Sequence, residues 1–249
     1  MATIRLFLVL LLAIANVELA YASGLDDGSA GLAAAQRGDF DQAIRLFTAA
    51  IASGELSPRN KMLAYHNRGN TYQDKENYGK AIADYSTVIR LQPDYAQAWY
   101  SRGRAQFALG MFPAAIADLV HSIALDPSDG YSVLWLYLAR SNTTTSDVAE
   151  LERNSRKLDL AAWPGPLVNL YLGKTTPGQA RAASARGNAD TQTDRTCEAE
   201  FFIGEYELLR KDVVTARTRF QDAVKSCPYT SDERDGAVAE LRRMRQAIR

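Results

Sequence analysis

The sequence predicts an all-α fold, a right-handed helical solenoid of paired antiparallel helices. Three observations predict it: marked positions recur with a period of 34 residues, small residues recur at fixed offsets, and prolines close several periods. The composition agrees, because 47% of the 249 residues are apolar, which is enough for a sizeable core. Stacked helix pairs of this kind bury a continuous core and leave a concave inner surface.

Each period carries a glycine, an alanine twelve residues later, and a bulky residue four residues after the alanine. Glycine and alanine let two helix axes approach closely, and a proline ends the second helix because it has no N–H to donate. We therefore expect each set to be one two-helix unit. The sets are Gly31, Ala43 and Phe47; Gly69, Ala81 and Tyr85; Gly103, Ala115 and Leu119; and Gly204, Ala216 and Phe220, with Pro93, Pro127 and Pro228 closing the last three.

This pattern resembles the tetratricopeptide repeat (TPR). The resemblance implies a non-catalytic protein-interaction scaffold in which the first helix of each unit lines the concave face and binds a peptide or a partner helix. For Tyr100 and Phe107 the alternative is packing against neighbouring helices. The family's positions give this partner-binding groove: His66, Asn70, Gln73, Asp74, Gln97, Tyr100, Arg104 and Phe107.

One known binding mode of the family clamps a C-terminal carboxylate between cationic side chains of successive units. Here Asn70 is retained, but His66, Gln97 and Ser101 stand where the two lysines and the arginine of the clamp would be. We therefore do not expect this carboxylate clamp.

Residues 1–22 have the layout of a signal peptide. Arg5 precedes an apolar run from Leu6 to Ala15, and Ala20, Tyr21 and Ala22 form a small-x-small cleavage pattern. The run is too short to cross a bilayer, so we expect no membrane span after signal removal. The mature protein is expected to be secreted across the inner membrane, into the periplasm.

The remaining chain divides into three parts. We expect three TPR units in residues 24–129, degenerate helical repeats ending in a polar loop (186–194) in residues 130–195, and a last TPR unit plus a capping helix in residues 196–249. Helices are expected over 130–139, from the capping box at 147–150, over 166–172 and over 177–186. The capping helix places its apolar residues on one face: Val238, Leu241, Met244 and Ile248.

The overall layout also resembles the periplasmic TPR lipoprotein family called new lipoprotein I, in the segments 135–139 and 169–173. That resemblance implies a scaffold or adaptor of the bacterial cell envelope that forms a homodimer, although this chain lacks the lipidated cysteine. The competing hypothesis is a structural or accessory subunit of an envelope secretion or polysaccharide export complex.

The two cysteines and two histidines limit the chemistry. Cys197 and Cys227 are expected at neighbouring ends of one helix pair, which favours a disulfide over two buried free thiols. His66 and His121 have no partner at metal-binding spacing, and the chain has no nucleophile elbow, phosphate loop or dinucleotide fingerprint. We therefore expect no enzyme, cofactor or metal. With 29 basic and 29 acidic residues we also expect no nucleic acid partner.

Overall fold

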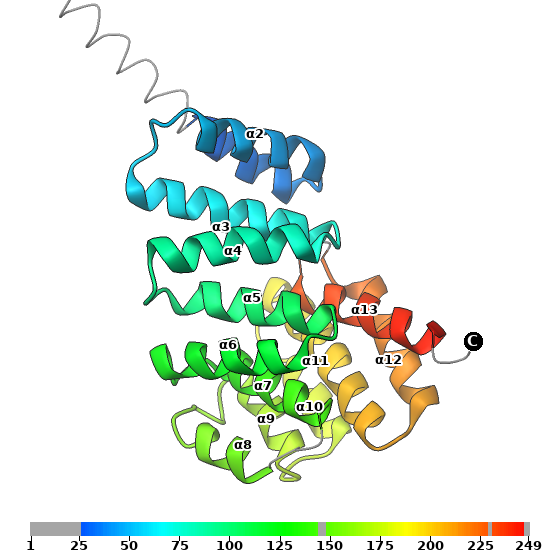
Figure 1. Ribbon diagram of the computed structural model, residues 1–249. Helices are drawn as coiled ribbons and strands as arrows, with labels where there is room; N and C mark the ends of the chain where they lie inside the picture. Colours follow the sequence, from blue (N-terminus) through cyan, green and yellow to red (C-terminus); the bar gives the residue numbers. More distant parts are fainter. Residues whose placement is uncertain (1–25, 144–147, 229–230, 247–249) are drawn as a thin grey trace, which may run out of the picture.

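The structure, a computed structural model, describes residues 26–143, 148–228 and 231–246. Every regular element within these ranges is a helix, which confirms the predicted all-α class. Figure 1 shows the helices stacked one below another from the blue N-terminal end through green, with the C-terminal helices returning beside the middle of the stack. The predicted signal peptide lies outside the described residues.

Three antiparallel helix pairs form the N-terminal half of the stack. Asp39, Ser57 and Asn77 each cap the N-terminus of the next helix by accepting a backbone N–H with the side chain. The pairs are a helix over residues 26–36 with α2 (Phe40–Ala52), α3 (Pro58–Asp74) with α4 (Tyr78–Leu91), and α5 (Ala96–Ala108) with α6 (Phe112–Leu125).

The glycines mark the places where the paired helices cross. A Cβ atom added at Gly69 would lie 2.8 Å from Cε1 of Tyr85, and one at Gly103 would lie 2.9 Å from Cγ of Leu119. Gly204 stands in the same relation to Phe220, at 2.7 Å. The structure thus confirms the close crossing that the spacing of glycine and bulky residue predicted.

A repeated ion pair, which we did not predict, fastens two of the units. Arg68 donates two hydrogen bonds to Asp84, both of 2.8 Å, and Arg102 donates two to Asp118, of 2.7 and 2.8 Å. Arg102 also donates to Ser86 of the preceding unit at 3.0 Å. Paired hydrogen bonds of this kind fix the geometry between the two helices of a unit and hold it to its neighbour.

Shorter helices continue the stack before the last long pair. Trp135 lies at the centre of this half and packs against Phe107, Phe201 and Phe202, with ring centroids 5.0, 5.1 and 5.9 Å away. The helices are α7 (Gly130–Ser141), α8 (Val148–Ser155), α9 (Gly165–Tyr171), α10 (Pro177–Ser184), α11 (Ala189–Leu209), α12 (Val213–Ser226) and α13 (Asp232–Gln246).

The structure confirms several of these helices and differs from the prediction in the segment before α11. Thr176 caps α10 in a capping box, and α9 ends just before Gly173, which has a φ of 68°. The polar segment 186–194 is not a loop throughout, because α11 begins at Ala189. Asn188 accepts a hydrogen bond from the backbone N–H of Thr191 at 3.0 Å, so polar residues here form the exposed first turns of a helix.

Helix α13 does more than cap the last unit. It packs on α11 and α12, but it also reaches back to α5 in the third helix pair, as Figure 1 shows beside the middle of the stack. Arg243 donates hydrogen bonds to the carbonyl oxygens of Phe107 and Ala108. The inner surface of α13 carries the buried carboxylates Glu233 and Asp235 besides Met244, so the predicted apolar face of this helix is incomplete. Ile248, the last residue of that predicted face, lies outside the described residues.

Candidate functional site

A groove opens between the helix over residues 26–36, α3 and α5. Its main cavity has a volume of about 270 Å³, and a second cavity of about 190 Å³ continues it past Leu32 and Asn67. Apolar side chains, Leu32 and Phe47, form part of the wall, and amide side chains form much of the rest. The polar residues that line the main cavity include Gln36, Asn67, Asn70, Asp74 and Gln97.

Five of the predicted groove residues line this cavity: Asn70, Gln73, Asp74, Gln97 and Arg104. The side-chain oxygen of Asn70 accepts a hydrogen bond of 2.8 Å from the Tyr85 hydroxyl, which fixes the amide in the groove. Burial raises the pKa of Asp74 to about 7, although the positive charge of Arg104 acts in the opposite direction.

The structure places His66 and Phe107 between helices, away from this groove. His66 is 7% exposed and lies between the rings of Tyr85 and Tyr95, with centroids 5.7 and 5.6 Å away. Burial lowers its pKa to about 4. Phe107 is 1% exposed and packs edge-on against Phe112 and Trp135, which matches the alternative reading of helix packing.

Arg104 connects the groove to α13. Its side chain is buried and forms an ion pair with Asp232, and its guanidinium carbon lies 5.1 Å from the centroid of the Tyr100 ring. Asp232 lines the groove cavity as well. The start of α13 therefore closes one end of the groove, and the third helix pair contributes only part of its inner face.

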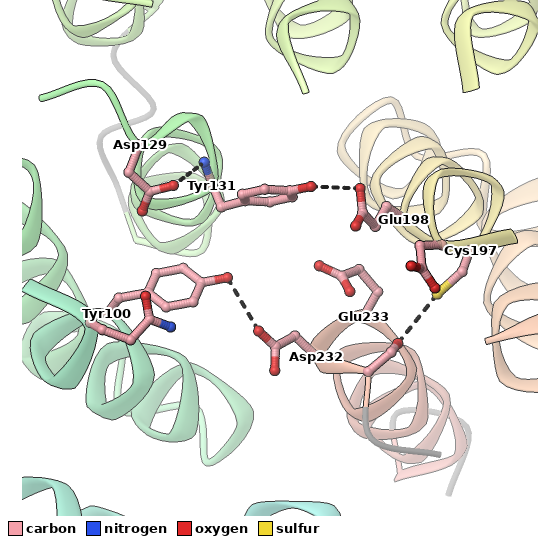
Figure 2. Close-up of a pocket in the computed structure, with 10 residues that line it drawn as sticks. Tyr100, Asp129, Tyr131, Cys197, Glu198, Asp232 and Glu233 are labelled. Carbon is pink, nitrogen blue, oxygen red and sulfur yellow. Dashed lines mark hydrogen bonds between the residues drawn. The ribbon is translucent and has the colours of Figure 1, made fainter. Parts of the chain in front are cut away.

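A separate cavity of about 350 Å³, the acidic pocket, lies on the other side of Asp232, between α5, α7, α11 and α13 (Figure 2). Tyr100, the remaining predicted groove residue, lines this pocket together with Tyr131 and Gln97. No lysine or arginine is among the described residues that line it. Five carboxylates do so: Asp129, Asp194, Glu198, Asp232 and Glu233.

Most of the carboxylates in this acidic pocket have hydrogen-bond donors. Asp129 caps α7 and accepts from the backbone N–H groups of Tyr131 and Ser132, at 3.0 and 3.1 Å. Glu198 accepts from the Tyr131 hydroxyl at 2.7 Å and from Nε1 of Trp163. Its pKa is nevertheless raised, because burial disfavours the charged form more than these donors stabilise it.

The Glu233 carboxylate is also buried, and its pKa is raised. It is 6% exposed, and burial together with the negative charge of Glu198 raises its pKa to about 7, against the attraction of Arg104. No local sequence pattern indicated this pocket, because its walls come from four helices far apart in the chain. A neutral net charge concealed it further.

The disulfide lies beside the acidic pocket. Cys197 of α11 and Cys227, which follows α12, are bonded to each other with Cα atoms 4.8 Å apart, as the sequence predicted. Cys197 lies within α11 and not at its start, because the helix begins earlier than expected. Its sulfur is 3.3 Å from the hydroxyl of Ser231, which directly precedes α13.

Within the described part of the chain, no group of three or more histidine, cysteine, aspartate or glutamate side chains is arranged to hold a metal ion. Among the helices of residues 26–143, 148–228 and 231–246, none combines the length and apolar character that crossing a bilayer requires.

A stack of helix pairs with glycine-marked crossings and a groove on its inner side defines a helical repeat protein. Comparison with known families agrees: residues 29–66 and 96–129 match models described as tetratricopeptide repeat, and residues 69–110 match one described as TPR repeat. The N-terminal half of the chain therefore contains tetratricopeptide repeats, a fold used for protein interaction scaffolds, and the predicted resemblance is confirmed to that extent.

Solved structures resemble the chain at low identity. A tetratricopeptide repeat protein from Parabacteroides merdae is 17% identical with a TM-score of 0.52, over 86% of this chain and 82% of that one. A TPR protein from Thermus thermophilus is 18% identical with a TM-score of 0.45, over 88% and 100%. The second TPR domain of human RPAP3, solved with an HSP70 peptide, is 26% identical with a TM-score of 0.43, over 49% and 97%.

These likenesses concern the fold alone. They do not support the finer resemblance of the layout to new lipoprotein I, which stays a prediction.

Proposed function

We propose that this protein is an interaction scaffold that holds an extended peptide segment of a partner protein in the groove between the helix over residues 26–36, α3 and α5. The groove itself carries the proposal, because it combines apolar anchoring sites with amide side chains. Amides such as Gln36 and Asn67 can both donate to and accept from a peptide backbone. Leu32 is 45% exposed and lines both cavities of the groove, so it can cover an apolar side chain of the peptide.

The charges favour an internal segment of the partner over a free C-terminus. Capture of a terminal carboxylate needs unpaired cations. Arg104 is buried and already paired with Asp232, and Asp74 lies in the same wall. We therefore expect the bound segment to be uncharged or basic near α13.

We further propose that the scaffold acts in the bacterial cell envelope. Residues 1–22 have the layout of a signal peptide, and a disulfide such as Cys197–Cys227 persists in oxidising compartments. Export would place the groove where it can meet other envelope proteins.

A peptide selection with matched leucine variants tests the groove. Peptides selected from a random display library on residues 23–249 are titrated calorimetrically against the wild type, Leu32→Ser and Leu91→Ser. The two leucines are similarly exposed, at 45% and 48%, but Leu91 lines neither cavity of the groove. Loss of an apolar anchor of about 1.4 kcal/mol should weaken binding about tenfold in Leu32→Ser.

The control should bind like the wild type. Equal binding by both variants, or failure to select any peptide, would exclude the groove as the binding site.

A further inference from the structure

The acidic pocket gathers more negative charge than the helix cap of Asp129 and the ion pair of Asp232 account for. Five carboxylates line about 350 Å³, and no cationic side chain of the described residues is among the lining. Arg104 lies just behind Asp232 and is engaged in that ion pair. Carboxylates gathered in this way repel one another unless a cation joins them.

Glu233 has no hydrogen-bond partner in another side chain of the described residues, although nine-tenths of it is buried. Figure 2 shows its carboxylate directed into the pocket, between Tyr131 and Asp232, with no dashed line reaching it. A hydrogen bond from its own backbone N–H lowers its pKa, but less than burial raises it. A buried carboxylate whose only charged neighbour of opposite sign is already engaged costs free energy, so a ligand that donates to Glu233 would stabilise it.

We propose that the pocket between α5, α7, α11 and α13 binds an alkyl guanidinium or alkyl ammonium group, with the Glu233 carboxylate as its counter-ion. The group comes either from an arginine or lysine side chain of a protein or from a free amine. The proposal does not rest on the peptide groove, because a free cation can occupy the pocket alone.

Size and wall chemistry fit this class of ligand. A cavity of about 350 Å³ is at the small end of ligand pockets, which suits one side chain or a small amine. Tyr100 and Tyr131 line the same space, and tyrosine rings attract cations at their faces. Glu198 provides a second carboxylate, already oriented by Tyr131 and Trp163.

Binding should be coupled to proton release. The charged groups that face Glu233 are Arg104 on α5, Asp129 on α7, and Asp194 and Glu198 on α11. With a pKa of about 7, Glu233 is ionised in only a fraction of molecules at mildly acidic pH. A bound cation selects the ionised form, so affinity should rise about tenfold between about pH 6 and about pH 8.

The test titrates residues 23–249 with three small probes by calorimetry. The probes are acetyl-arginine methylamide, agmatine, and acetyl-citrulline methylamide, which has nearly the shape of the first but no charge. Both cations should bind, and the citrulline probe should bind at least about tenfold more weakly. Tighter binding of the capped arginine assigns the pocket to a protein side chain, and tighter binding of agmatine assigns it to a free amine; both outcomes support a cation site.

Two glutamate variants locate the site. Glu233→Gln should weaken the cations at least about tenfold and abolish proton release, measured from the buffer dependence of the binding enthalpy. Glu205→Gln is the matched control, because Glu205 is 1% exposed with a pKa raised to about 8 but does not line the pocket. It should bind within about twofold of the wild type.

Three results would overturn the proposal. They are no binding of either cation at millimolar concentration, equal binding of the citrulline probe, and equal weakening by the two glutamate variants. The first two are measured on the wild type, so they remain decisive if a variant fails to fold.

Discussion

Replacing Gly69 by alanine should destabilise the protein, although alanine is the better helix former. The added Cβ would lie 2.8 Å from Cε1, 3.0 Å from Cδ1 and 3.3 Å from Cζ of the Tyr85 ring, inside the ordinary contact distance of about 3.5–4.0 Å. Tyr85 cannot move aside easily. It is fully buried, and its hydroxyl donates to Asn70 at 2.8 Å.

The two opposing effects can be compared. Overpacking in a close-packed core costs about 1–3 kcal/mol, whereas alanine gains about 1 kcal/mol over glycine within a helix. Gly69→Ala should therefore lose up to about 2 kcal/mol of unfolding free energy. For a chain of this size that lowers the melting temperature by up to about 8 °C.

Gly79 provides the matched control. It lies in α4, and a Cβ added there meets nothing within 4 Å, so Gly79→Ala should gain up to about 1 kcal/mol. Urea unfolding followed by circular dichroism measures both variants against the wild type. If Gly69→Ala is as stabilising as Gly79→Ala, the helices do not cross closely at Gly69 and the repeat phase is wrong.

Three further perturbations have expected outcomes. Serine at both Cys197 and Cys227 should cost about 3–4 kcal/mol, because the disulfide closes a loop with a sequence separation of 30; unchanged urea unfolding would contradict this. Arg104→Ala should destabilise the protein by about 2–3 kcal/mol and speed hydrogen exchange in α13, since it removes the positive charge beside the buried Glu233 and Asp235 and the half-exposed Asp232. Unchanged exchange would show that the Arg104–Asp232 pair does not hold α13. Asp74 and Glu233 have raised pKa values of about 7, so the stability they contribute is complete below about pH 4 and is lost as the pH rises through about 7. The melting temperature should therefore be higher at about pH 5 than at about pH 8, and a rise over that interval would contradict the assignment.

The repeat architecture could be predicted because its determinants are local. Gly69 meets Tyr85 and Gly103 meets Leu119 at a separation of 16 residues, so one helix pair contains all that the pattern needs. The Arg102 and Asp118 pair has the same separation and could also have been found, since it repeats the preceding unit after 34 residues. The prediction used only the small, bulky and proline positions of the repeat, so it did not include this ion pair.

The site was predictable only in part, because α13 meets the array through distant contacts. Tyr100 and Asp232 are 132 residues apart, and neither carries a local signal of the other. The family positions of Asn70 and Asp74 depend only on the phase of α3, and both side chains line the groove cavity. The same family positions predict His66 in the groove, but the ring of Tyr95 from the next unit packs against the His66 ring. The position of a residue on its own helix does not determine which side chains of other helices cover it.

Hydrogen exchange of the complex with a selected peptide tests the central claim most directly. If the groove binds the partner, the peptide should slow amide exchange in residues 26–36, α3 and α5, and leave α6 and α12 unchanged. Neither α6 nor α12 contributes to the walls of the groove. Slower exchange confined to α6 or α12, with none along residues 26–36 and α3, would show that the partner binds the outer face and would contradict the account.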